Sequence, residues 1–334
     1  MDDTAGSQQN GEELSLPDPY RPTVPVDAES FDAPQPNLAS KPRFWTAIAV
    51  PAVSFFIFII VSGFMLVVGM LVVIGRFEPW MLQDAETIGI VSKSLLGLVC
   101  IIVVPQIALV APSILAAVVS RVETAKRLSF VRGHWPIWAW IAAAVATPLI
   151  GFVTSICLSF LVQESENLKN FSEIFRSHGH GLSFLMLALI VGVTPAVCEE
   201  ILFRGYVQTR LKRSWGPMMA IFFSSLLFAI GHMDPIHALG VFPLGVFLGF
   251  VCWRSGSIYP AILGHFVNNV VSVVMVVLAP EDKDTLAIPA AITVLLVLGL
   301  GIIGMAAVAY SSVRYPPQSP LLNAGDNPIT NVTG

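Results

Sequence analysis

Residues 182–205 read LSFLMLALIVGVTPAVCEEILFRG, an apolar run that ends with two glutamates and an arginine. The apolar part is long enough for a helix that crosses a bilayer, which needs about 20 such residues. A charged side chain at the centre of such a helix is unfavourable by roughly 2.5–3.5 kcal/mol on insertion scales. Because charged residues inside membrane helices usually serve a function, Glu199, Glu200 and Arg204 are the first candidates for a site.

The composition places the whole chain in the membrane class. Of its 334 residues, 55% are hydrophobic and 12% are charged, whereas a soluble domain carries about 25% charged residues. The net charge of −4 provides no basic surface, so we expect no nucleic-acid partner. The four cysteines all lie in apolar segments and predict no disulfide framework.

The apolar segments predict an all-α, polytopic membrane protein with about eight transmembrane helices. Two prolines, Pro105 and Pro112, predict a kink in the second helix. The candidate spans are residues 44–74, 87–119, 135–162, 182–209, 217–233, 236–252, 257–279 and 286–311.

The same pattern divides the chain into three parts. Residues 1–43 are rich in Pro, Asp, Glu and Ser and predict a disordered tail, residues 44–314 form the membrane domain, and residues 315–334 form a short polar tail. Lysine and arginine concentrate on the side of the N-terminus, for example in residues 121–132 and 204–213. Because such residues mark inner loops, we expect a cell-membrane protein with both termini in the cytoplasm.

The spacing of the charged residues in 182–205 predicts one ion pair. Glu200 and Arg204 are four residues apart, with the glutamate on the N-terminal side, which is the favourable order in a helix. Glu199 is turned by about 100° from Glu200 and has no partner in its own helix. Glu199 is therefore the better candidate for chemistry, and Glu200 for a supporting role.

Two later segments carry polar residues at the same spacing. FAIGH places Phe228 and His232 on one helix face, and HFVNN places His265 and Asn269 on another. Counting from the nearest basic residues, Glu199 and His265 both lie about 16 Å inside the cytoplasmic boundary. A single such His or Asn often only joins helices, but their common depth predicts a site among the predicted helices 4, 5 and 7.

In this order, EEILFR, FAIGH and HFVNN resemble the EExxxR, FxxxH and HxxxN motifs of the CAAX-processing and bacteriocin-processing (CPBP, or Abi) intramembrane proteases, which include the type II CAAX prenyl endopeptidases. The resemblance covers about residues 182–279, which we take as the protease core. It implies an intramembrane endopeptidase that hydrolyses a lipophilic or membrane-associated peptide or protein, in contact with membrane lipid.

The resemblance also implies four catalytic residues. Glu199 and His232 would activate a water molecule for attack on the scissile carbonyl, and His265 and Asn269 would stabilise the oxyanion that develops. The implied supporting residues are Glu200, Arg204 and Phe228.

The sequence leaves alternatives on two points: whether the site uses a metal ion, and whether the protein is an enzyme. One glutamate and two histidines can hold zinc, but the chain has no HExxH motif, and the same residues suffice for a metal-free glutamate–water mechanism. We expect the latter, with no cofactor. The alternatives to an enzyme are a non-catalytic membrane scaffold or immunity protein of the same family, and a transporter that uses Glu199 and the histidines as a proton relay.

Overall fold

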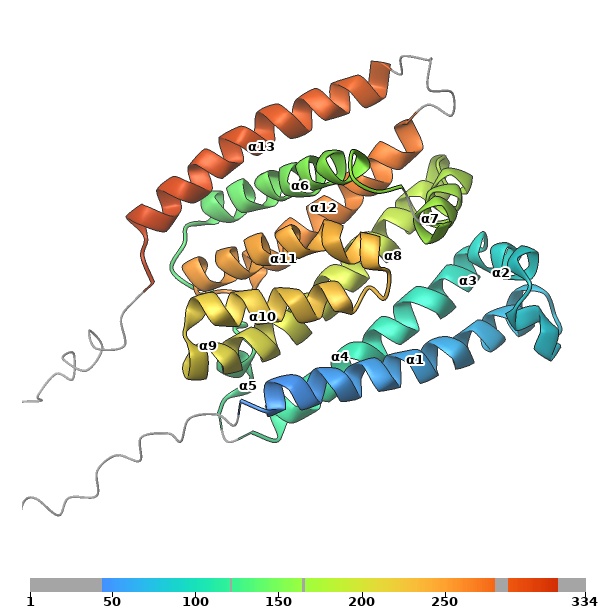
Figure 1. The fold of residues 1–334 in the computed structure, drawn as a ribbon, viewed down its shortest axis with the longest axis horizontal. Coiled ribbons are helices and arrows are strands. Elements are labelled where there is room, and N and C mark those ends of the chain that lie inside the picture. Colours follow the sequence, from blue (N-terminus) through green and yellow to red (C-terminus); the bar gives the residue numbers. More distant parts are fainter. Residues whose placement is uncertain (1–43, 121, 164–165, 280–287, 318–334) are drawn as a thin grey trace, which may run out of the picture. The chain divides into compact units, whose positions relative to one another are not determined.

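The computed structural model describes residues 44–120, 122–163, 166–279 and 288–317, with side chains from 169 onward in the third range. The predicted tails, residues 1–43 and 315–334, lie outside these ranges except for 315–317. The described residues contain helices and no strand, and all of these helices belong to one compact unit (Figure 1).

Within the described ranges, seven helical stretches are long and apolar enough to cross a membrane. This confirms the predicted all-α, multi-pass fold. They are α1 (Thr46–Val73), α3–η3–α4 (Leu95–Leu98, Val99–Val103, Val104–Val118), α6 (Ile137–Ser159), α8–η4–α9 (Gly181–Glu200, Ile201–Gln208, Thr209–Trp215), α11 (Pro235–Ser255), α12 (Tyr259–Leu278) and α13 (Ile288–Arg314).

The predicted span 217–233 is shorter than expected. Helix α10 (Pro217–Ile230) has 14 residues and is about 21 Å long, against about 30 Å of hydrocarbon. It begins after Gly216, whose φ of 81° suits glycine, and it ends before a turn in which Met233 has a φ of 54°. This turn leaves His232 just beyond the helix end.

The predicted span 87–119 begins later than expected, because its first part is a separate helix. In α2 (Ala85–Ser92) the carboxylate of Asp84 accepts a hydrogen bond from the Thr87 backbone N–H at 2.9 Å, which caps the helix. Hydrogen bonds from the hydroxyl and the backbone N–H of Thr87 also lower the pKa of Asp84. The chain then turns at Lys93, and the membrane-spanning stretch starts at Leu95.

Helix α7 (Glu166–Ser177) was not predicted, because its sequence is polar and reads as an outer loop. Its apolar residues Ile174 and Phe175 pack against a buried cluster that includes Leu187 of α8 and Val273 of α12. The remaining short helices are η2 (Pro79–Leu82) and α5 (Thr124–Arg127).

Two membrane helices contain π-helical segments, η3 and η4. Segment η3 ends two residues before Pro105, which has no N–H to bond the carbonyl one turn earlier. The kink expected from Pro105 and Pro112 stays a prediction. In η4 all eight residues are buried. A π-helical turn holds extra residues and so rotates the next part of the helix, and such segments often occur at functional sites.

Helix α12 lies between α6, α8 and α11, and α6 in turn packs against α13, while α1 packs against α4 (Figure 1). Small residues allow the closest approaches, as is usual in membrane proteins. A Cβ atom at Gly304 of α13 would lie 2.7 Å from the carbonyl oxygen of Ala142 and 3.0 Å from the backbone nitrogen of Ala146, both in α6.

We predict that G304V lowers the stability of the protein by about 1–3 kcal/mol, because backbone atoms of α6 cannot make room for the added side chain. The matched control is G299V in the same helix, where a Cβ meets no atom within 4 Å. The check is thermal unfolding in detergent. Equal melting temperatures for the two variants would contradict this close α6–α13 packing.

Candidate active site

A fully buried network joins Glu200, Arg204 and His265. Arg204 Nη1 donates to Glu200 Oε1 at 2.8 Å, and neither side chain is exposed. His265 Nδ1 lies 2.9 Å from the same oxygen. Because an ionised carboxylate only accepts hydrogen bonds, this nitrogen carries a proton. The predicted Glu200–Arg204 pair is thus formed, and it also holds a side chain of α12.

Arg204 lies in η4, and its guanidinium contacts three groups: the Glu200 carboxylate, a backbone carbonyl oxygen and an aromatic ring. Its Nη2 donates to the carbonyl oxygen of Gly245 in α11 at 2.9 Å. Its guanidinium carbon lies 4.6 Å from the centre of the Phe228 ring, a cation–π distance. Phe228 is buried and its ring meets that of His265 edge-on, at 5.8 Å between centroids. These contacts bring η4, α10, α11 and α12 together around one guanidinium.

Glu199 lies beside this network and uses its two oxygens differently. Its Oε1 accepts a hydrogen bond from Nε2 of Gln106 in α4 at 2.8 Å. Its Oε2 is buried, has no hydrogen-bond partner among the described protein atoms, and lies 3.9 Å from His265 Nε2. The carboxylate is therefore held at one oxygen, while the other faces an imidazole.

Gln106 is a site residue that was not predicted from the sequence. The side chain is an isolated amide in the apolar run VVPQIALVAP, residues 103–112, and this isolation was a usable signal. Nothing in the sequence indicates its partner, because the two residues of the pair are 93 positions apart. Only the packing of α4 against α8 and η4 brings them together.

The structure places His232 and Asn269 around this centre without direct bonds to Glu199 in the described region. His232 Nδ1 lies 3.0 Å from the carbonyl oxygen of Phe228, and its ring centroid lies 5.0 Å from the Phe228 ring. Asn269 donates to the carbonyl oxygen of Val191 in α8 at 3.2 Å. The structure therefore brings Glu199, Glu200 and His265 together, and it links His232 to them through the ring of Phe228. Asn269 lies one turn beyond His265 in α12.

The described side chains do not form a zinc site. Zinc usually takes three or four ligands from Cys, His, Asp and Glu, and no group of three such side chains suited to a metal occurs in the described ranges. Glu200 is already paired with Arg204 at 2.8 Å. The described residues therefore do not fit a bound metal ion.

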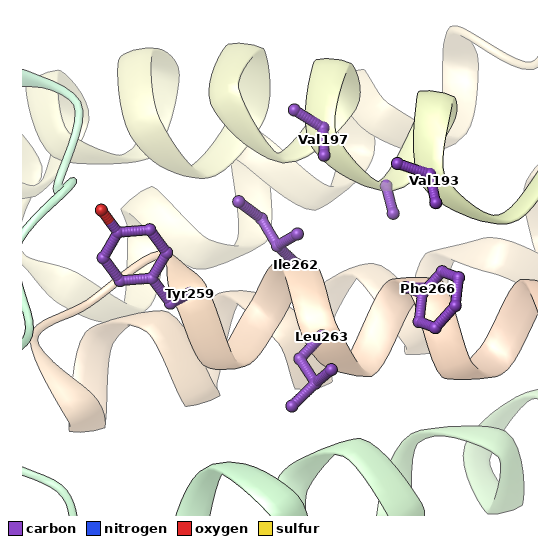
Figure 2. Close-up of a pocket in the computed structure, with 7 residues that line it drawn as sticks. Val193, Val197, Tyr259, Ile262, Leu263 and Phe266 are labelled. Carbon is purple, nitrogen blue, oxygen red and sulfur yellow. The ribbon is translucent and has the colours of Figure 1, made fainter. Parts of the chain in front are cut away.

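An apolar pocket of about 210 Å³ lies between α8 and α12 (Figure 2). Because Glu200 meets His265 and Val191 meets Asn269, the two helices are antiparallel, and the pocket lies between residues 193–197 of one and 259–266 of the other. Its lining suits an apolar chain rather than a polar ligand. The lining residues are Val193, Ala196 and Val197 of α8 and Tyr259, Ile262, Leu263 and Phe266 of α12.

These features define a multi-pass membrane protein with paired carboxylates and a histidine in its interior. In comparison with protein families, residues 181–271 match the family model described as Type II CAAX prenyl endopeptidase Rce1-like. The predicted family resemblance is confirmed for this segment, which contains the three motifs and does not contain Gln106. Comparisons with curated proteins and with solved structures gave no match.

We predict that E200Q and R204Q each destabilise the protein by about 3–5 kcal/mol, because each leaves a buried charge without its partner. The double variant should lose less than the sum of the two, with a coupling of at least about 1 kcal/mol. The check is a double-mutant cycle of unfolding in detergent. Additivity within about 0.5 kcal/mol would contradict an energetic link between the two side chains.

Proposed function

We propose that the protein is an intramembrane endopeptidase that hydrolyses a peptide bond with a water molecule activated by Glu199. One observation carries the proposal: Glu199 Oε2 is buried, lacks a hydrogen-bond partner among the described protein atoms, and lies 3.9 Å from His265 Nε2. A carboxylate oxygen in this state can accept a proton from water in a site of low dielectric constant. The match of residues 181–271 to the Rce1-like family supports the same reaction.

In the proposed reaction, the water oxygen attacks the scissile carbonyl carbon and its proton moves to Glu199 Oε2. His265 Nε2 donates a hydrogen bond to the oxyanion of the tetrahedral intermediate. Since Nδ1 already donates to Glu200, Nε2 can do so only when the ring carries both protons. The C–N bond then breaks, and Glu199 returns the proton to the leaving amine. No cofactor takes part.

His232 and Asn269 keep the roles that the resemblance implies, which are to assist the attacking water and to stabilise the oxyanion. Their support in the structure is positional. His232 packs against the same Phe228 ring that contacts His265, and Asn269 lies one turn beyond His265 on the same face of α12. Both roles require the substrate to lie between these side chains and Glu199.

We propose a lipophilic or membrane-associated peptide or protein as the substrate. The apolar pocket between α8 and α12 supports this choice, because its lining, on the two helices that carry Glu199, Glu200 and His265, suits an apolar chain (Figure 2). The protein would act in the cell membrane with both termini in the cytoplasm, as the distribution of lysine and arginine predicts.

We predict that E199Q lowers peptide hydrolysis by about 10²- to 10⁴-fold, because the amide cannot accept the proton from water. The check uses purified protein in liposomes, a library of amphipathic and membrane-derived peptides, and mass spectrometry of the products. The matched control is E86Q, the same change at an exposed position in α2. Equal cleavage by wild type and E199Q would refute the proposed base. A cellular function that E199Q retains in full would favour the non-catalytic scaffold.

A further inference from the structure

Gln106 lies outside the segment that matches the Rce1-like family, yet it contacts the proposed base. Its Nε2 donates to Glu199 Oε1 at 2.8 Å, and this is the one hydrogen bond that its side chain makes in the described region. An amide without a partner in an apolar environment is unfavourable. The bond to Glu199 therefore determines where this side chain lies.

A second buried glutamine shows how this contact differs from a hydrogen bond that only joins two helices. Gln208 in η4 is buried, and its Nε2 donates to the backbone carbonyl of Gly249 in α11 at 2.9 Å. That bond joins two helices without touching the carboxylates. Gln106 makes the equivalent donation to a carboxylate oxygen instead, so its bond acts on the reacting group itself.

The irregular backbone before Gln106 sets the direction in which α4 presents this side chain. The π-helical segment η3 ends at Val103, Pro105 comes two residues later, and Gln106 is next. An extra residue in one turn rotates the later residues by about 100° relative to a regular helix. Because α4 packs against α1, α8 and η4, this rotation is held in place by its neighbours.

We infer that Gln106 is a positioning residue for Glu199, an inference that rests on the proposed function. The amide fixes Oε1 and thereby leaves Oε2 facing His265 Nε2 at 3.9 Å. The proposed site therefore includes a residue of α4 as well as residues of the segment 181–271 that matches the Rce1-like family.

The first test compares Q106M with wild type in peptide hydrolysis. Methionine keeps the length of the side chain and removes the donor. We expect kcat to fall by about 10- to 100-fold with KM within about twofold, because Glu199 is no longer held in place while substrate binding is unchanged. Q106N, whose amide is one methylene too short, should change in the same direction. The matched control Q208M should keep the wild-type kcat and KM even if it is less stable.

The second test does not depend on hydrolysis. A hydrophobic carbodiimide modifies carboxyl groups in membranes, and mass spectrometry distinguishes modification at Glu199 from that at Glu200. At one fixed pH, we expect Glu199 to be modified faster in Q106M than in wild type and Q208M, because Oε1 is no longer held by the amide, with E199Q as the unlabelled control. An unchanged rate of labelling together with an unchanged kcat would overturn the role of Gln106. If wild type shows no hydrolysis that depends on Glu199, the proposed function fails. The labelling then still tests whether Gln106 positions Glu199.

Discussion

A single buried carboxylate oxygen, Glu200 Oε1, accepts hydrogen bonds from two side chains. The arrangement of α8, with its continuation η4, and of α10, α11 and α12 depends on it. Arg204 approaches at 2.8 Å and His265 at 2.9 Å. A buried carboxylate without such partners would be strongly unfavourable, so α8, which carries Glu200, and α12, which carries His265, must meet at this level. Arg204 then extends the link to α11 through Gly245 O and to α10 through the ring of Phe228.

Each π-helical segment lies close in sequence to one partner of the hydrogen bond between Gln106 and Glu199. Segment η4 begins directly after Glu200, and η3 ends three residues before Gln106. Regular helices would arrange the surrounding side chains differently, because each extra residue in a turn rotates the rest of the helix. The hydrogen bond between Gln106 and Glu199 therefore joins the two places where the membrane helices depart from regular geometry.

Local spacing predicted part of this site, and tertiary packing supplied the rest. The Glu200–Arg204 pair comes from a four-residue separation, and the long spans come from hydropathy alone. Gln106 could not be paired from the sequence, because its partner is 93 residues away and on another helix. The place of His232 in a turn depends on the early end of α10 at Ile230, a boundary that an uninterrupted apolar pattern does not reveal. The polar helix α7 was missed for a related reason, since only a few apolar residues, such as Ile174 and Phe175, give it a face that packs.

The most direct measurement of the central arrangement is the nitrogen NMR spectrum of His265 in protein with labelled histidine, assigned by its loss in H265N. We predict a proton on Nδ1, donated to Glu200 Oε1. Replacing Glu200 by glutamine should shift the Nδ1 signal. A neutral ring with its proton on Nε2 and a bare Nδ1 would contradict the shared oxygen on which the proposed site depends.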